Sequence, residues 1–298
     1  MLKGNKKTIL VTGGAGFIGS NLIERLVEDP QNDVYSLDNY FTGTKENHIP
    51  GATYIEGHTK DISNLITKIP DVVYHLGEYS RVAQSMEEPD VVWDLNVLGT
   101  CAVLEFCRHL KCKLVYAGSS TKFAGLRNDG VEGKDLSPYT WAKATNTDLV
   151  RNYGEWYGLA YVTVYFYNVY GPRERAGKYG TVIEIFKQKH LVGESLEVRL
   201  PGTQRRTYTH VVDTVDGLIL AGEKGSGDGY GISSSKSYTI LEVANLFGDE
   251  IVMLPERKTS RPSSVVDTAQ MEALGWKETH ALEDYISAFL VKDTKGEK

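Results

Sequence analysis

The chain has 298 residues, of which 41% are hydrophobic and 24% are charged, and its formal net charge is −6. This length can bury a large core in one or two domains, and the composition is ordinary for a globular protein. The acidic balance argues against non-specific nucleic-acid binding, no apolar run approaches the ~20 residues of a membrane helix, and the basic start MLKGNKK is not typical of a signal peptide.

The first expected element is a buried strand that runs into a glycine-rich turn and a helix. Ile9–Thr12 is apolar and β-branched, the chain breaks at Gly13, and a helical pattern begins at Phe17. The spacing of Gly13, Gly16 and Gly19 lets the backbone turn tightly and approach a pyrophosphate, which the N–H groups at the helix start would face. The strand, turn and helix together predict a dinucleotide site.

The second expected strand, Val34–Asp38, ends in an acidic residue. Asp38 follows the glycine pattern by about twenty residues, the distance expected for a carboxylate on the adenosine ribose. A carboxylate accepts two ribose hydroxyls but repels a 2′-phosphate, and residues 39–42 contain no arginine that could hold one. The sequence therefore favours NAD over NADP.

Strand and helix patterns alternate through the first half of the chain. We expect strands at Ile9–Thr12, Val34–Asp38, Thr53–Glu56, Asp71–Leu76, Lys113–Ala117 and Ala160–Tyr167. The helical patterns between them include Phe17–Glu28, Val91–Leu110 and Tyr139–Tyr157. Continuous apolar strands separated by helices predict an α/β fold with a Rossmann-type doubly wound parallel sheet, which binds its ligands beyond the carboxyl ends of the strands.

The regular alternation fades after Gly171, where a helical pattern at Thr181–Leu191 is followed by short elements. We expect residues 1–171 to form the NAD-binding domain, with residues 206–222 returning to it. Residues 172–205 and 223–298 would form a smaller, substrate-binding C-terminal lobe that covers the carboxyl edge of the sheet.

Three cysteines, Cys101, Cys107 and Cys112, show neither metal-ligand spacing nor a pairing pattern. An odd number cannot be fully paired within one chain. We interpret them as reduced structural thiols and expect a cytoplasmic protein without a metal site.

Tyr139 and Lys143 lie four residues apart in a helical pattern and hence on one helix face. The same spacing occurs by chance on exposed helices, but an ammonium beside a phenol would favour the phenolate and so a base that works near neutral pH. The segment Ser119-Ser120-Thr121, at the end of the preceding strand, brings hydroxyls into reach of the same crevice. With a nicotinamide cofactor, these groups would oxidise a secondary alcohol.

With these motifs the chain resembles an extended short-chain dehydrogenase/reductase of the nucleotide-sugar epimerase/dehydratase family, similar to the UDP-galactose 4-epimerases. The resemblance runs from about Lys7 to Leu290. Besides TGGAGFIGS and YTWAK, it rests on LDNYFTG (37–43), NVLGT (96–100), FYNVYGPR (166–173), QRRTYTHVVD (204–213) and TSRPSSVVDTAQMEALGW (259–276).

The resemblance implies which residues form the site. NAD would be bound by Gly13, Gly16, Phe17, Ile18, Asp38, Asn39, Thr42, Gly43, Asp61, Ile62, Leu76, Gly77, Asn96, Tyr139 and Lys143. The catalytic residues would be Ser120, Tyr139 and Lys143. The nucleotide-diphosphate sugar would be bound by Ser120, Tyr139, Asn168, Arg206 and Arg261, in which the arginines suit bidentate bonds to phosphate oxygens.

Two departures from the family pattern bear on the reaction. Nucleotide-sugar 4,6-dehydratases of the family typically carry an Asp-Glu pair after the catalytic Ser/Thr, whereas Thr121 and Lys122 stand here. The acid–base pair that such an elimination needs is therefore missing, and a 4-epimerase does not need it. The segment from Glu78 to Arg81 is polar where the family is often small or apolar.

We therefore expect an NAD-dependent nucleotide-sugar 4-epimerase that acts on UDP-glucose/UDP-galactose or their N-acetyl forms through a transient 4-keto sugar. The alternatives are a nucleotide-sugar 4,6-dehydratase or 4-dehydrogenase and, more remotely, a non-catalytic NAD-binding regulator. The resemblance also implies a homodimer in which the Val91–Leu110 and Tyr139–Tyr157 helices pair into a four-helix bundle.

Overall fold

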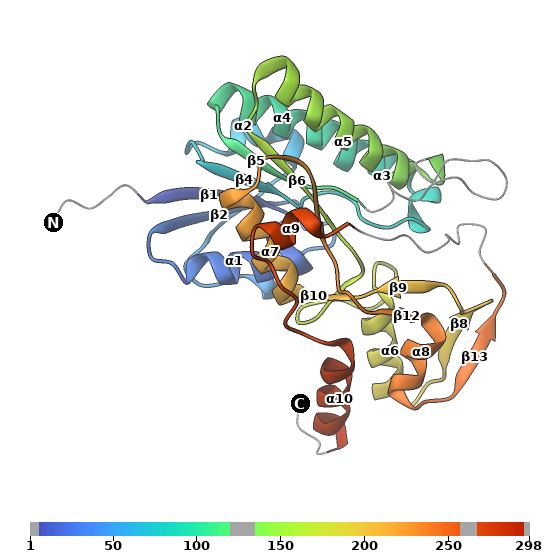
Figure 1. The fold of residues 1–298 in the computed structure, drawn as a ribbon. Helices are drawn as coiled ribbons and strands as arrows, with labels where there is room; N and C mark the ends of the chain where they lie inside the picture. Colours follow the sequence, from blue (N-terminus) through green and yellow to red (C-terminus); the bar gives the residue numbers. More distant parts are fainter. Residues whose placement is uncertain (1–5, 120–134, 257–266, 295–298) are drawn as a thin grey trace.

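Seven parallel strands form one sheet in residues 6–119, 135–256 and 267–294, the parts of the chain that the computed structural model describes. The strands lie in the order β11-β6-β5-β4-β1-β2-β3 (Figure 1). Their bounds are Lys7–Thr12 (β1), Asn32–Asp38 (β2), Thr53–Glu56 (β3), Val72–His75 (β4), Lys113–Ala117 (β5), Tyr161–Phe166 (β6) and Gly227–Ile232 (β11). This order confirms the predicted Rossmann-type sheet, and it changes direction between β1 and β4, where such sheets bind their ligands.

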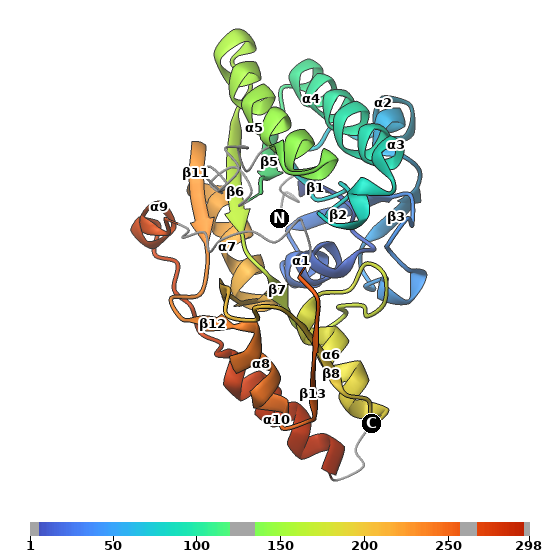
Figure 2. The same ribbon diagram turned by 90° about the vertical axis from the view of Figure 1, so that its right-hand side faces the viewer.

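Helices cover both faces of the sheet (Figures 1 and 2). Helices α1 (Phe17–Val27) and α7 (Val211–Lys224) pack on one face, and α4 (Gly99–Leu110) and α5 (Pro138–Tyr157) on the other. Because successive side chains of a strand point to opposite faces, β1 contributes to both cores. Ile9 and Val11 pack with the α1/α7 side, and Leu10 packs with the α4/α5 side.

The helix predicted at Val91–Leu110 has three parts in the structure. It consists of α3 (Pro89–Val92), the π-helical segment η4 (Trp93–Leu98) and α4. Segments of this kind inside longer helices occur frequently at functional sites. Here the π-helical segment carries Asn96, whose side-chain amide binds both the N–H and the C=O of Tyr79 beside the ligand-binding edge.

The start and end of α5 are fixed by local sequence signals. The Ser137 hydroxyl accepts a hydrogen bond from the Thr140 N–H, and the Thr140 hydroxyl accepts one from the Ser137 N–H. Pro138 occupies the first helical position, where its missing N–H is not needed. Gly158 ends the helix with a φ of 69°. These caps place Tyr139 in the first turn of α5 and Lys143 one turn later.

A smaller lobe lies at the carboxyl edge of the sheet (Figure 1). Its core joins Tyr170 and Tyr208 to apolar residues of its helices and strands. The lobe and its connections contain β7 (Val169–Tyr170), α6 (Val182–Leu191), β8 (Leu196–Arg199), β9 (Arg205–Thr207), β10 (Thr209–His210), β12 (Ser237–Thr239), α8 (Ile240–Phe247), β13 (Ile251–Leu254) and α10 (Leu282–Thr294). The remaining short helices are η1 (Lys45–Asn47), η2 (Thr59–Asp61), α2 (Ile62–Leu65), η3 (Gln84–Met86) and α9 (Ala269–Ala273).

The border between the two lobes differs from the one expected for residues 223–298. Strand β11, which lies in that range, pairs with β6 and extends the main sheet. Met271 of α9 and Trp276 pack into the core on the α1/α7 side of the sheet, and the Trp276 indole N–H donates to the Asp213 carbonyl at 2.9 Å. Among the described helices, none combines the length and the hydropathy that a membrane-spanning helix requires.

Candidate active site

A cavity of about 640 Å³ lies at the carboxyl edge of the sheet. Its floor is formed by residues that follow the strands directly, among them Gly13 after β1, Asp38 at the end of β2, Gly77 after β4 and Ser119 after β5. The loop of residues 172–181, between β7 and α6, forms an outer wall. The cavity therefore lies where the topology of the sheet predicts a ligand.

The turn between β1 and α1 has the shape of a pyrophosphate cradle. Gly13 has a φ of 71°, and a Cβ atom there would lie 2.8 Å from the Cα atom of Gly77 and from the Leu76 carbonyl oxygen. A Cβ atom on Gly19 would lie 2.1 Å from the Gly13 carbonyl oxygen. Helix α1 begins after Gly16 without a side-chain cap, so the N–H groups of its first turn are available to an anion.

The Asp38 side chain lies at the far end of the same cavity and is held by backbone groups. One carboxylate oxygen accepts the Ala15 N–H and the other accepts the Tyr40 N–H, both at 2.8 Å. Burial raises the pKa of Asp38, and these two hydrogen bonds oppose the rise. Each oxygen keeps a second lone pair for a ribose hydroxyl, so the residue fits the adenosine end of NAD.

Tyr139 and Lys143 come together in the cavity with Ser119. The Tyr139 hydroxyl donates to the Ser119 hydroxyl at 3.3 Å. The Lys143 ammonium donates to the Ala117 carbonyl at 2.6 Å and also binds the Glu78 carboxylate. A phenol, a serine hydroxyl and a buried ammonium thus converge at the end of β5, where they could move a proton to or from a sugar hydroxyl.

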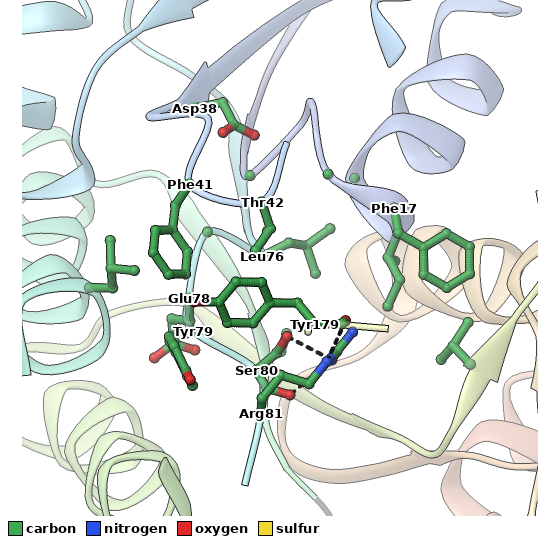
Figure 3. Close-up of a pocket in the computed structure, with 18 of the residues that line it drawn as sticks. Phe17, Asp38, Phe41, Thr42, Leu76, Glu78, Tyr79, Ser80, Arg81 and Tyr179 are labelled. Carbon is green, nitrogen blue, oxygen red and sulfur yellow. Dashed lines mark hydrogen bonds between the residues drawn. The ribbon is translucent and has the colours of Figure 1, made fainter. Parts of the chain in front are cut away.

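The outer wall reaches the residues that follow β4. Tyr179 packs against Phe41 and Tyr79 at ring-centroid distances of 5.3 and 6.1 Å. The Arg81 guanidinium donates to the Tyr179 carbonyl at 2.6 Å and to the Ser80 carbonyl and hydroxyl at 3.0 Å. Figure 3 shows the Tyr179 ring projecting into the cavity, with Asp38 and Arg81 at opposite ends. The position of this wall therefore determines how much room a ligand has.

Glu174 is an unusual group on the same wall. Both of its carboxylate oxygens are buried and accept no hydrogen bond of ordinary geometry from the described residues. Burial, together with the charge of Glu184, raises the pKa of Glu174 to about 8. The cavity therefore contains a carboxyl group that can exchange a proton near neutral pH.

Comparison with known proteins identifies the family. The model of the NAD dependent epimerase/dehydratase family matches residues 9–233. A putative UDP-glucose 4-epimerase of Methanocaldococcus jannaschii is 32% identical over 284 residues, which cover 90% of this chain and 92% of that protein. The chain belongs to the NAD-dependent epimerase/dehydratase family. It is therefore an NAD-dependent enzyme.

Other members of the family are similar at comparable levels. UDP-glucuronic acid decarboxylase 3 of Arabidopsis thaliana is 29% identical over 289 residues, covering 90% of this chain and 84% of that protein. Among solved structures, the UDP-glucose 4-epimerase of Thermotoga maritima, with UDP-glucose, has a TM-score of 0.88 and 28% identity, covering 98% of this chain and all of the other. The Thermus thermophilus UDP-glucose 4-epimerase complex with NAD has a TM-score of 0.84 and 28% identity, covering 95% and 98%. The names of these relatives include both epimerases and a decarboxylase at similar levels of identity.

Most of the site residues expected from the sequence line the cavity. The structure brings together Gly13, Gly16, Phe17, Ile18, Asp38, Asn39, Thr42, Leu76, Gly77, Tyr139, Lys143 and Asn168. Others lie behind the lining. Gly43 packs against Asp38 and Ala15, Asn96 holds the Tyr79 backbone, and Ile62 is buried in the core under α4.

Four further predicted site residues lie outside the cavity lining or outside the described residues. Asp61 is exposed at the end of η2 and does not line the cavity. Arg206 lies on β9, outside the lining, and burial lowers its pKa. The predicted catalytic Ser120 and the predicted phosphate ligand Arg261 lie outside the described residues, so both assignments stay predictions.

Little in the sequence indicates the groups that line the outer wall of the cavity. Arg175, whose guanidinium donates to the Thr42 carbonyl at 3.0 Å, and Glu174 follow the FYNVYGPR block, and no spacing ties them to the other site residues. Glu78 and Arg81 could have been found, because they are charged residues directly after a buried strand of the sheet. His75, by contrast, is fully buried between Thr12 and Thr100, as expected for a core histidine.

Proposed function

We propose that the protein is a nucleotide-sugar 4-epimerase that acts on UDP-glucose/UDP-galactose or their N-acetyl forms. The observation that carries this proposal is the hydrogen bond between Tyr139 and Ser119 in the cavity that also contains the glycine cradle and Asp38. An acid–base phenol and an NAD site in one cavity suit the removal and return of hydrogen at a sugar carbinol. Two epimerase relatives that cover nearly the whole chain support it further.

In this reaction Tyr139 is the base that takes the proton of the 4-hydroxyl, while Ser119 or Ser120 orients that oxygen. NAD, which the glycine turn at Gly13 and the Asp38 carboxylate would hold, would supply the acceptor and donor of hydride for C4. Tyr139 then returns the proton after the 4-keto sugar has presented its other face. Thr121 and Lys122 follow the serines in place of an Asp-Glu pair, so the chain offers no carboxylate there for an elimination at C5 and C6.

The test is to incubate the purified protein with UDP-galactose, UDP-glucose and their N-acetyl forms and to record proton NMR spectra of the sugars. We expect inversion at C4 in at least one pair, without stoichiometric release of NADH. The proposal would be refuted if none of these sugars is inverted at C4 and if, instead, UDP-glucuronic acid loses its carboxyl group or another nucleotide sugar yields a 4-keto product.

One observation favours a second candidate, a nucleotide-sugar 4,6-dehydratase. That reaction needs an acid–base group besides Tyr139, and Glu174 lies in the same cavity with a pKa raised by burial to about 8. A 4-keto-6-deoxy sugar in the same spectra, abolished by Glu174→Gln, would establish the dehydratase in place of the epimerase.

We further propose that the protein is a homodimer. An exposed apolar patch, here called the tryptophan patch, is formed by Trp93, Val97, Leu98 and Trp141 on η4 and α5. The two indoles meet edge to face at 5.5 Å, and Leu98 is 55% exposed. Contiguous exposed apolar surface of this kind marks contact sites, and the patch lies on the helices expected to pair.

The three free cysteines suit a reducing cytoplasm, to which we also assign the protein.

A further inference from the structure

Glu78 is a carboxylate buried at the floor of the cavity, with its side chain only 2% exposed. Thr100 and Asn146 each donate to one of its oxygens at 2.8 Å, and the Tyr116 hydroxyl donates to the same oxygen at 3.2 Å. A charge is expensive to bury unless it is paired and hydrogen-bonded. Three neutral donors from three elements of the fold therefore hold this one carboxylate in place.

The other Glu78 oxygen binds the Lys143 ammonium, whose side chain is 6% exposed. Burial acts to raise the pKa of Glu78, but the charge and hydrogen bond of Lys143, together with His75 and Thr100, outweigh it and hold the pKa below its usual range. The Glu78 carboxylate therefore keeps its negative charge beside the Lys143 ammonium.

The groups around this pair do not change that balance. Burial lowers the pKa of His75 to about 4, so its ring is neutral at neutral pH. Burial raises the pKa of Tyr116 well above its usual value, so that phenol keeps its proton. Arg81 lines the same cavity, where its guanidinium binds Ser80 and Tyr179 and its charge interacts with Glu174 and Tyr139. Glu78 is the carboxylate that compensates Lys143.

We propose that Glu78 is a positioning residue that acts through Lys143: it fixes the ammonium and cancels its charge, so that the cavity favours oxidised over reduced NAD. The oxidised nicotinamide ring is positively charged, and the ring becomes neutral when it accepts a hydride. An uncompensated ammonium in the same cavity would favour the neutral ring. This inference rests on the proposed function. There the C4–H bond breaks, the hydride would pass to NAD, and the hydroxyl proton goes to Tyr139. Both the hydride and the proton must then return to the sugar.

The experiment compares the cofactor preference of four proteins: the parent, Glu78→Gln, Glu78→Asp and Tyr116→Phe. Each holoenzyme is equilibrated with equal concentrations of NAD⁺ and NADH and freed of unbound nucleotide, and the released cofactors are quantified by mass spectrometry. We expect the bound NADH:NAD⁺ ratio to rise about tenfold in Glu78→Gln, as for one lost compensating charge in a poorly solvated site. Glu78→Asp keeps the negative charge, so its bound NADH:NAD⁺ ratio should stay within about threefold of the parent's. A threefold change is well below the tenfold change expected when the compensating charge is lost.

Tyr116→Phe is the matched control, since it removes a neutral hydrogen bond to the same carboxylate. It should loosen Glu78 without moving the ratio. An unchanged ratio in Glu78→Gln, or an equal rise in Tyr116→Phe, would overturn the proposal. If Glu78→Gln does not fold, Lys143→Met and Lys143→Met/Glu78→Gln provide the same comparison, and the single variant should bind relatively less NADH than the double.

This readout is independent of the sugar. A shifted cofactor ratio in a protein that inverts no sugar would reject the proposed function and retain the role of Glu78. An epimerase whose bound NADH:NAD⁺ ratio does not change in Glu78→Gln would retain the proposed function and reject the role of Glu78.

Discussion

At the residue scale, the proton chemistry depends on Tyr139 and on how its neighbours are fixed. The phenol is nearly buried and bonded to Ser119, and Lys143 is tied to both Ala117 and Glu78. Because the cap at Ser137 fixes the first turn of α5, the phenol has little freedom to leave the end of β5. The site is therefore preorganised before any ligand binds.

Tyr139→Phe tests the role of that phenol. The variant removes one oxygen, so the rate of sugar turnover should fall at least about a hundredfold while NAD stays bound, as for the loss of a general base. Tyr153→Phe on the same helix is the control, since its hydroxyl binds Glu105 at 2.7 Å, away from the cavity. Steady-state kinetics with the cofactor content of each protein check this, and a Tyr139→Phe enzyme as fast as the Tyr153→Phe control would refute the role.

Residues that act through local spacing could be predicted from the sequence, and residues brought in by tertiary contacts could not. Tyr139 and Lys143 share a helix face, and Asp38 follows the glycine turn at a fixed distance, so both predictions rest on short-range geometry. The partnership of Glu78 with Lys143 joins residues 65 positions apart, and it forms where Lys143 of α5 reaches the ends of the neighbouring strands β4 and β5. No periodicity in the chain encodes that contact.

At the scale of elements, the β1–α1 turn has no room for a side chain at Gly13. Gly13 combines a positive φ with backbone atoms of Gly77 at less than 3 Å from any added Cβ. This close approach brings the turn after β1 against the turn after β4, and together they form the floor on which the pyrophosphate would lie. Conformation and packing thus require glycine at the same position.

Gly13→Ala should therefore cost more than conformational strain alone. We expect a loss of about 2–5 kcal/mol in the free energy of unfolding, which combines the cost of a left-handed backbone with that of an overpacked contact, and a marked loss of bound NAD. Gly248→Ala is the matched control, because Gly248 has a φ of 80° with no atom within 4 Å of an added Cβ. That control should be destabilised by only about 1 kcal/mol and keep its NAD. Denaturant unfolding measures the free energy of unfolding of each variant, and mass spectrometry measures its bound NAD. Equal losses in Gly13→Ala and Gly248→Ala would contradict the prediction.

At the scale of the whole molecule, the main sheet recruits a strand from the last third of the chain. The segment Gly227–Ile232 is rich in glycine and lacks an apolar run, so it gives no strand signal of its own. It becomes a strand through tertiary contacts, because it pairs with β6 while Tyr230 and Ile232 pack into the core on the α1/α7 side. The predicted border at residue 223 differs from the structure for this reason, whereas the six apolar strands were predictable.

The proposed dimer also belongs to this scale. Leu98→Glu introduces a charge into the tryptophan patch without disturbing a core, and we expect it to convert the dimer to a monomer. Val192→Glu, at a residue that is 67% exposed at the end of α6, is the control and should stay dimeric. Sedimentation velocity distinguishes the two, and a monomeric parent protein, or a dimeric Leu98→Glu, would refute the proposed interface.

The most direct test of the account follows one hydrogen atom. UDP-galactose and its N-acetyl form, each carrying deuterium at C4, are incubated with the enzyme, and the sugar products are analysed by NMR and mass spectrometry. If hydride leaves C4 and returns to the same carbon, the C4 epimer of at least one of them will form with deuterium retained at C4 and with no reduced nicotinamide in solution. Deuterium lost to water, deuterated NADH released from the enzyme, or no inversion at C4 would contradict the account.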